Sequence, residues 1–507
     1  MTAEAWFLSR TERGNPASTI ESFTTGNAVR ALVHGRTYFR ALHRAIADPR
    51  AGDTILFTDW RADLDELLDG PGTAFGEVLT AAAGRGVVIQ GLIWRSHAER
   101  HTFSAEPNRA LVDAIQAAGG DCLLDMRVKV GGSHHQKLFV VRHPDRPEAD
   151  VAFVGGIDIC HSRGDSADHD GDAQTLPMNP AYGERPPWHD VQLEIRGPAV
   201  SDVETVFRER WNDPAELTRH PLRRLRDTLD RRRNTPATTA RHTPPPPPAG
   251  DLPVQVLRTY PRLRYPFAPR GERSIARAYL KALPRARRLI YIEDQYLWST
   301  EVARPFAEAL RRNPELHLIA VLPKHPDSAH GLVAEAELYG RRRAMALLRK
   351  AGGDRVACYT LENPARTPIY VHAKVCVIDD TWSTVGSDNF NLRSWTYDSE
   401  LSCAVFEPDG FPRDLRLTLQ REHLGRVDGD DGDLLDPMSS FAAFAKSAAE
   451  LDSWHDAGCT GARPAGQLRR YDAPALTSWR KPAAKLIQQV VCDPDGRPKH
   501  LRLRHHF

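Results

Sequence analysis

The sequence predicts an α/β protein made of two pseudo-symmetric α/β repeats, each a mixed or mainly parallel sheet flanked by helices. Three observations predict this fold. Helical and strand-like segments alternate along the 507 residues, the same order of segments occurs twice, and each copy leads to a His-x-Lys pair at the start of an apolar strand.

The two copies match segment by segment. Residues 41–63 and 277–299 each predict an amphipathic helix, a short turn and a buried strand that ends in polar and aromatic residues. A second helix and strand follow in both copies. These are Phe75–Gly84 with Val87–Trp94, and Arg304–Arg312 with Leu316–Leu322. The repeated order favours a duplicated unit.

The shared signature is His135-x-Lys137 in the first copy and His372-x-Lys374 in the second, each followed by four apolar residues. Composition alone gives about 0.4 such pairs for 21 His and ten Lys in 507 residues. Two pairs at equivalent places are therefore more than chance, and we expect the repeats to pack around one shared active site.

This residue pattern suits attack on a phosphate diester. Residues i and i+2 of a strand share a face, so each histidine points the same way as its lysine. Lysine can neutralise the non-bridging oxygens, while histidine acts as nucleophile or proton donor. Two copies supply both roles: one imidazole attacks phosphorus and the other protonates the leaving oxygen.

Small and polar residues after each signature are candidates for binding the phosphate. A glycine lets the backbone approach an anion closely, and hydroxyl or amide groups can donate to its oxygens. The candidates are Gly155, Gly156 and Asp158 in the first copy, and Gly386, Ser387 and Asn389 in the second.

These motifs resemble the phospholipase D superfamily, whose mark is His-x-Lys-x4-Asp-x6-Gly-[Gly/Ser]-x-Asn present twice. The resemblance covers roughly residues 25–425 and is strongest to eukaryotic-type phospholipases D. The supporting segments are residues 133–137, 155–160, 187–191, 196–198, 291–296 and 385–394. The resemblance implies hydrolysis of a phosphatidylcholine-like glycerophospholipid to phosphatidate and a free alcohol, with transfer of the phosphatidyl group to another alcohol as a side reaction.

The resemblance also implies roles for the site residues. His135 would form the covalent phosphohistidine and His372 would be the general acid, although the symmetry leaves the reverse open. An acidic residue should hold the second nitrogen of each imidazole: Asp190 in the first half, and Asp398 or Glu400 in the second. No metal or other cofactor is expected for this mechanism.

One position departs from the family pattern. The first copy has Arg142 where the motif aspartate is expected, and six extra residues precede Gly155. By strand parity this position faces away from His135 and Lys137. We expect its loss to affect packing more than chemistry.

The predicted organisation has four parts. Residues 1–240 form the first repeat, 241–250 a Pro-rich linker, 251–425 the second repeat, and 426–507 an extension of unknown role. Arg219–Arg233 is interpreted as a solvated helix, and the acidic stretch Asp165–Asp172 as a solvated loop without the spacing of a calcium site.

Composition restricts the partners. The chain has 68 Lys and Arg against 66 Asp and Glu, so nucleic acid is a disfavoured partner. Its seven cysteines are scattered and indicate neither a disulfide framework nor a zinc motif. No signal peptide or membrane-spanning run is evident. We expect a monomeric, cytoplasmic protein that meets a phospholipid substrate at the membrane surface, while export without a signal peptide stays open.

Three alternatives remain open. A phosphatidyltransferase similar to cardiolipin synthase would use the same chemistry with another acceptor. A nuclease of the same superfamily would favour a basic groove over aromatic walls. A non-catalytic scaffold is possible because fold alone does not determine activity, but intact His-x-Lys pairs in both halves argue against it.

Overall fold

The computed structural model describes residues 2–97, 104–218, 220–240, 242–327, 331–426, 429–474 and 480–507. The first half forms one mixed sheet whose neighbouring strands run in the order β1, β8, β6, β5, β2, β3, β4. Their bounds are Thr24–Val33, Val191–Arg196, Val151–Gly155, Leu138–Arg142, Thr54–Asp59, Val88–Trp94 and Asp121–Asp125. The pairs β2–β3 and β3–β4 are parallel, and the other pairs are antiparallel.

The second half repeats this arrangement. Its strands neighbour one another in the order β9, β17, β16, β15, β11, β12, β13, again with parallel pairs at the β11–β12–β13 end. Their bounds are Leu252–Tyr260, Glu400–Phe406, Trp382–Gly386, Lys374–Ile378, Leu289–Asp294, His317–Val321 and Val356–Glu362. The matching strand order confirms the predicted duplicated α/β fold.

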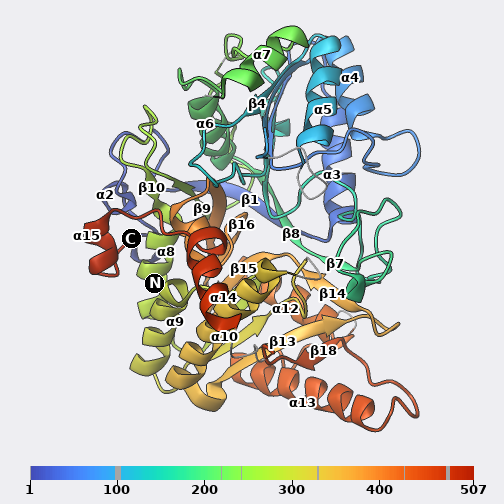
Figure 1. Cartoon of the computed structure of the whole chain (residues 1–507), viewed down its shortest axis with the longest axis vertical. Coiled ribbons are helices and arrows are strands. Elements are labelled where there is room, and N and C mark those ends of the chain that lie inside the picture. Colours follow the sequence, from blue (N-terminus) through green and yellow to red (C-terminus); the bar gives the residue numbers. More distant parts are fainter. Residues whose placement is uncertain are drawn as a thin grey trace.

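Helices cover the outer faces of both sheets, and the inner faces share a core. Figure 1 shows the first half above the second, with the covering helices at opposite ends. They are α3 (Gly35–Ala47), α4 (Phe75–Gly84), α5 (Ala105–Ala117), α8 (Ser274–Ala282), α9 (Thr300–Arg312) and α10 (Leu332–Gly352). Valines of both sheets, such as Val140 and Val375, pack with α6 (Ala199–Trp211) and α12 (Phe411–Leu424) in one apolar cluster.

The remaining elements are short or lie at the edges. They are α1 (Ala3–Trp6), α2 (Arg10–Arg13), η1 (Pro147–Ala149), η2 (Pro180–Tyr182), β7 (Trp188–His189), α7 (Pro221–Leu229), β10 (Glu272–Arg273), η3 (Leu283–Arg285), η4 (Gly353–Arg355), β14 (Pro368–Val371), α11 (Leu392–Thr396), α13 (Pro437–Asp456), β18 (Leu468–Arg470), α14 (Lys481–Ile487), η6 (Gln488–Cys492) and α15 (Lys499–Leu503). None of the described helices has the length and apolar character needed to cross a bilayer.

Both ends of the chain pack on the second half. Trp6 and Phe7 are buried in the apolar cluster of α8 and α9, although the sequence analysis placed them with the first repeat. Strand β18 pairs with β13, and α14 packs on α10. The described residues of the extension thus complete the second half.

Arg142 explains how the first half tolerates its missing aspartate. The Arg142 side chain is buried, pairs with Asp150 and Glu204 at 3.3 and 3.2 Å, and donates to Thr243 in the linker. In the second half, Asp379 accepts backbone N–H groups of residues 287–289 at 2.6–2.9 Å. Both residues stabilise packing, as the strand parity predicts, and Arg142 also fastens the linker. Residues 219 and 241 lie outside the described residues.

Candidate active site

The two His-x-Lys signatures occupy equivalent places, at the entry to β5 and to β15. The backbone N–H of His135 donates to the Ser399 carbonyl at 2.9 Å, and that of His372 donates to the His189 carbonyl at 2.8 Å. Each histidine is therefore held by backbone from the other half of the chain. This crossing brings the two signatures together between the sheets.

The carboxylates that hold the imidazoles also cross between the halves. Nδ1 of His372 lies 2.6 Å from Asp190, and Nδ1 of His135 lies 2.8 Å from Glu400. We expected each acid to hold the histidine of its own half, and that pairing is wrong. Position in the sequence could not show it, because the partner is chosen by packing across the interface. In both pairs, the contact at Nδ1 leaves Nε2 available for chemistry.

Asp398 does not hold an imidazole. Its carboxylate pairs with Arg393 at 2.6 Å and accepts the backbone N–H of Ser133 at 2.8 Å. Between the two acids proposed for the second half, the structure therefore selects Glu400. Ser387 donates its hydroxyl to Glu400 at 2.6 Å, so its side chain supports the acid and is not free for the phosphate.

The lysines are fixed beside their histidines. Lys137 Nζ lies 3.2 Å from Asp158, and Lys374 donates to Gln295 at 3.3 Å and to the carbonyl of His372. Asp158 was expected to bind phosphate, but its carboxylate is buried against Lys137 and would repel an anion. Burial opposes its ionisation, yet Lys137 holds the pKa of Asp158 below its usual value. Asp158 thus positions the lysine.

The pKa of each histidine depends on the lysines of both signatures. Burial lowers the pKa of His135 well below its usual value, and both Lys137 and Lys374 lower it further. Burial likewise lowers the pKa of His372, with further lowering by Lys374 and by Lys137 from the other half. Both shifts favour the neutral imidazole, and each includes a contribution from the lysine of the opposite signature.

The glycines have packing roles that the sequence analysis did not anticipate. A Cβ on Gly386 would lie inside the Ser402 side chain, and one on Gly155 would lie 2.6 Å from the Val191 carbonyl. These two glycines allow close strand contacts. A Cβ on Gly156 would lie 2.4 Å from the Asp190 carboxylate, so this glycine makes room for the acid that holds His372.

Asn389 remains available to a ligand. It lines the cavity at His135, and its buried side-chain oxygen has no hydrogen-bond partner among the described residues. Arg163, for which no role was predicted, lies 3.7 Å from the centre of the Trp188 ring, and that ring lies tilted 4.9 Å from the His372 ring. Arg163 adds positive charge beside the site. In a chain so rich in arginine, sequence offered no signal for it beyond its place after residues 155–160.

A cavity of about 500 Å³ opens at His135. Its walls include four aromatic residues: Trp60, Trp94, Tyr296 and Trp298. Trp60 stacks on Trp94, and Tyr296 on Trp298, with ring centroids 5.3 and 3.8 Å apart. The side chain of Gln295, one residue before Tyr296, contacts Lys374 and Tyr370. The cavity also includes residues 490–492 and 494 of the extension, for which the sequence indicated no role.

A buried cluster behind His372 could hold a metal ion. Ring nitrogens of His34, His169 and His189 lie 2.7, 3.2 and 3.3 Å from the carboxylate of Glu422, and the other nitrogen of His189 lies 2.6 Å from Glu293. Imidazole and carboxylate donors suit zinc and related divalent metals. The sequence did not indicate the cluster because its members are far apart in the chain.

The acidic stretch contributes to this cluster and is only partly solvated. Asp168 and Asp170 are exposed as expected, but Asp165 and Asp172 are buried. Asp165 accepts the backbone N–H of Trp188 at 2.7 Å and lies 3.4 Å from a ring nitrogen of His169. The interpretation as a solvated loop was therefore wrong for the buried pair, whose carboxylates organise the turn.

Comparison with known proteins agrees with this geometry. Two family models match the chain: "Phospholipase D" over residues 65–260 and "Cardiolipin synthase, PLD-like domain" over residues 279–413. Among curated proteins, phospholipase D alpha 1 of Cynara cardunculus is 24% identical and that of Ricinus communis 26%, each over 71% of this chain and 59% of the relative. The chain thus spans about three fifths of the length of these relatives.

A solved structure shows the same fold. Phosphatidylserine synthase of Haemophilus influenzae Rd KW20 superposes with a TM-score of 0.54 at 12% identity, over 85% of this chain and 94% of that one. The two family models together match more than half of the chain, in the same halves that carry the paired signatures. This chain therefore belongs to the phospholipase D superfamily.

Proposed function

We propose that this protein hydrolyses a phosphatidylcholine-like glycerophospholipid to phosphatidate and a free alcohol. The observation that carries the proposal is the pair of imidazoles, each held at Nδ1 by an acid of the opposite half and each influenced by both lysines. This arrangement supplies a nucleophile and a proton donor to one phosphorus atom.

His135 is assigned as the nucleophile. Its side chain is 16% exposed and lines the cavity, whereas the His372 side chain is 7% exposed and lies against Trp188. Neutral Nε2 of His135 attacks phosphorus, and the bond from phosphorus to the headgroup oxygen breaks. Lys137 and Lys374 neutralise the charge on the non-bridging oxygens.

His372 donates the proton that the leaving alcohol needs. Its pKa is low in the free protein, mainly through burial, and the negative charge of a bound phosphodiester raises it. After the alcohol leaves, neutral His372 accepts a proton from water. The hydroxide equivalent attacks phosphorus, and the bond between phosphorus and Nε2 of His135 breaks. Phosphatidate is released, His135 returns to its neutral form, and His372 holds the proton that the next leaving alcohol needs.

The aromatic cavity supports a lipid substrate over a nucleic acid. Its wall of Trp60, Trp94, Tyr296 and Trp298 offers apolar surface, and aromatic faces also attract quaternary ammonium headgroups. The curated relatives are named phospholipases D, which agrees with this substrate class. We also propose residues 1–240 and 251–425 as the two repeats, on the matched strand order, except that Trp6 and Phe7 pack on the second repeat.

A phosphatidyltransferase is the second candidate. The family model that matches residues 279–413 is described as a cardiolipin synthase domain. The chemistry is the same until the second step, when an alcohol in place of water attacks the phosphatidyl–histidine. The ratio of phosphatidate to transfer product, measured with glycerol, serine or phosphatidylglycerol as acceptor, distinguishes the two.

The test uses a phosphatidyl ester of p-nitrophenol, whose leaving group needs no proton. The His372→Ala variant should release a burst of p-nitrophenol and accumulate a phosphatidyl adduct on His135, seen by mass spectrometry of the peptide. The His135→Ala variant should give neither. With natural phospholipid both variants should lose activity, while His500→Ala, an exposed position on α15, should match the wild type. An adduct on His372 would reverse the assignment, and DNA cleavage without lipid turnover would refute the lipid substrate.

A further inference from the structure

Helix α7 presents its apolar side to solvent. Leu222, Leu225 and Leu229 follow the spacing of one helix face and are 69, 56 and 72% exposed. The buried position of this helix is Asp227, which is 2% exposed. An ordinary surface helix has the opposite orientation, with leucines inward and charges outward. The exposed leucines therefore require an explanation beyond folding.

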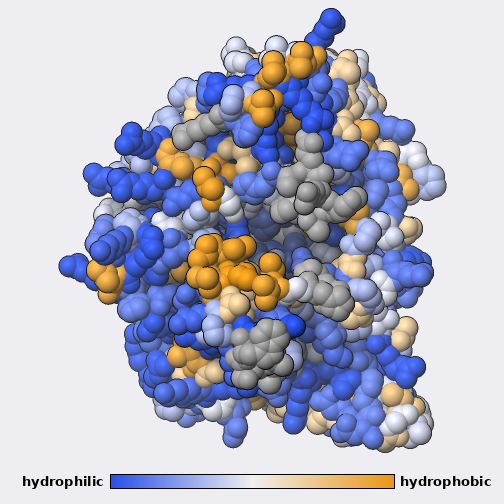
Figure 2. Space-filling view, in the orientation of Figure 1, coloured by the Kyte–Doolittle hydropathy of each residue, from blue (hydrophilic) through white to orange (hydrophobic). Residues whose placement is uncertain are grey.

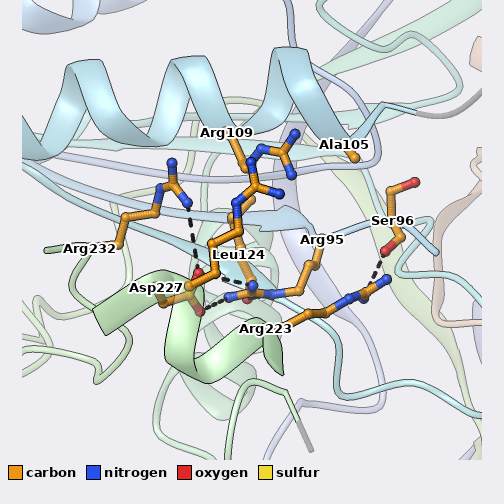
Figure 3. A pocket seen from close by; sticks show the side chains of 9 residues that line it. Arg95, Ser96, Ala105, Arg109, Leu124, Arg223, Asp227 and Arg232 are labelled. Carbon is orange, nitrogen blue, oxygen red and sulfur yellow. Dashed lines mark hydrogen bonds and ion pairs between the residues drawn. The ribbon is translucent and has the colours of Figure 1, made fainter. Parts of the chain in front are cut away.

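Ion pairs lock this orientation. Figure 3 shows Arg95, at the end of β3, reaching Asp227 of α7, and Arg223 of α7 reaching back to Ser96. The Arg95 guanidinium contacts both Asp227 oxygens at 3.1 and 2.5 Å, and Arg223 donates to the carbonyls of Ser96 and His97 at 3.1 and 2.5 Å. These contacts hold the polar face of α7 against the protein and leave the leucines outside.

A second apolar patch surrounds the active-site cavity. Val130 is 95% exposed, Val490 63% and Val491 51%, and all three line that cavity. Leu486 of α14, 63% exposed, extends the patch beyond the cavity wall. Figure 2 shows apolar surface gathered over α14 and again over α7, on the same face of the molecule.

The active-site cavity has a neighbour that reaches α7. A second cavity of about 530 Å³ shares His97, Val130 and Tyr397 with the active-site cavity, and it extends to His220 and Arg223 at the start of α7. The two cavities thus lie side by side between the active site and the start of α7.

The charge near α7 indicates what this face meets. Residues 220–233 contain six arginines against two aspartates. Arg224, Arg232 and Arg233 also pair with Glu216, Asp113 and Asp121 outside the segment, which leaves a small positive surplus. A helix with an exposed apolar stripe and surrounding arginines suits the interface of a membrane that contains anionic lipid, because the leucines enter the acyl boundary while the guanidinium groups meet phosphates. A bare apolar contact with a protein partner would not require this surplus of positive charge.

We propose that α7 and the patch around the cavity form a docking face that lies on an anionic phospholipid bilayer and points the active-site cavity into it. The proposal rests on the proposed lipid substrate and adds the surface from which that substrate enters. The face consists of Leu222, Leu225, Leu229, Val130, Leu486, Val490 and Val491, together with the half-exposed Arg224 and Arg226 of α7.

The experiment measures co-sedimentation with vesicles of phosphatidylcholine alone and with 30 mol% phosphatidylglycerol (a composition of about one third anionic lipid). Wild-type protein should bind the anionic vesicles, and binding should weaken at high salt. For the double variant Leu225→Glu/Leu229→Glu and for the single variant Leu486→Glu, the affinity for anionic vesicles should fall by about tenfold or more. Leu435→Glu, at an exposed leucine that lines neither cavity, is the matched control and should bind as the wild type does.

Turnover separates this proposal from the proposed function. On a short-chain phospholipid below its critical micelle concentration, the α7 double variant should keep the wild-type kcat/KM. On anionic vesicles its turnover rate should fall by about the same factor as its vesicle binding. If the wild type binds vesicles as predicted but turns over no phospholipid, the docking face stands and the substrate is wrong. Unchanged vesicle binding by the double variant would overturn the docking face. The docking face would also be overturned if the wild type were a dimer and the double variant a monomer, because a second copy of the chain would then cover this face.

Discussion

Asp190, from the first half of the chain, lies 2.6 Å from Nδ1 of His372 in the second half. Glu400 of the second half makes the reciprocal contact with His135 at 2.8 Å. Neither repeat therefore contains a complete His–acid pair. Packing of the two sheets creates both pairs at once, which couples the assembly of the site to the interface between the halves.

The first prediction concerns these two acids. Asp190→Asn and Glu400→Gln should each lower kcat about a hundredfold or more, because the amide no longer fixes the imidazole tautomer, while KM changes little. Asp398→Asn should cost much less, since Asp398 contacts neither imidazole in the described structure. Steady-state kinetics on a phospholipid substrate measure all three. An Asp398 variant as damaged as the other two would contradict the selection of Glu400.

The second prediction concerns Gly156. A methyl group at this position would lie 2.4 Å from an oxygen of Asp190 and must displace that carboxylate. Gly156→Ala should therefore lower kcat about tenfold or more through His372. The matched control is Gly84→Ala, where a Cβ meets nothing within 4 Å. Activity is compared with thermal unfolding of both variants; a Gly156 variant that keeps full activity would exclude this coupling.

The third prediction concerns the decrease of kcat/KM at alkaline pH, the alkaline limb of the pH profile. Burial is the main cause that lowers the pKa of Lys374 to about 8, with Asp190 and Asp294 opposing it. The ammonium is charged below this pH and neutral above it, so kcat/KM should fall above about pH 8 as the phosphate loses a cation. In Lys374→Arg the limb should move to higher pH, because a guanidinium stays charged.

If the decrease in kcat/KM above about pH 8 is unchanged in Lys374→Arg, the titrating group is Glu400 instead. Burial, with Asp398, raises the pKa of Glu400 to about 8, so this acid titrates in the same range. The Glu400→Gln variant, measured over the same pH range, distinguishes the two groups.

The fourth prediction concerns stability at the cluster around Glu422. Glu422→Gln leaves three imidazoles without their shared carboxylate and should lower the free energy of unfolding by roughly 3 kcal/mol. Exposed Glu308→Gln on α9 is the control and should change it little. Urea unfolding followed by circular dichroism provides the measurement.

The same cluster gives the stability effect a pH dependence. Burial opposes protonation of His189, but Glu293 and Glu422 raise its pKa from 6.5 to about 10. The stability from His189 is therefore fully present below about pH 6.5 and is lost as pH rises towards 10. Burial opposes ionisation of Glu422, but its histidines lower its pKa well below 4.5, so its contribution is lost as pH falls below that value. The difference between wild type and Glu422→Gln should be largest between pH 4.5 and 6.5; a difference independent of pH would contradict this account.

Several elements could be predicted from the sequence because their causes are local. Helix α4 occupies the predicted range Phe75–Gly84, and the strands after His135 and His372 lie where apolar runs indicated them. Helix α9 begins at Thr300 rather than the expected Arg304, and Pro305 lies inside it. The packing of Trp6 on the second half was not predictable, because the sequence of a short apolar segment does not show which surface it packs against.

The sequence by itself determined the duplicated α/β architecture, the two His-x-Lys pairs and the set of acids that could serve them. These features depend on residue type, periodicity and spacing, which act within one element. Only the tertiary structure decided that Asp190 serves His372 and Glu400 serves His135, that Asp158 neutralises Lys137, and that α7 turns its leucines outward. Each of these is a choice among partners far apart in the chain, made by packing and by the cost of leaving a buried charge unpaired.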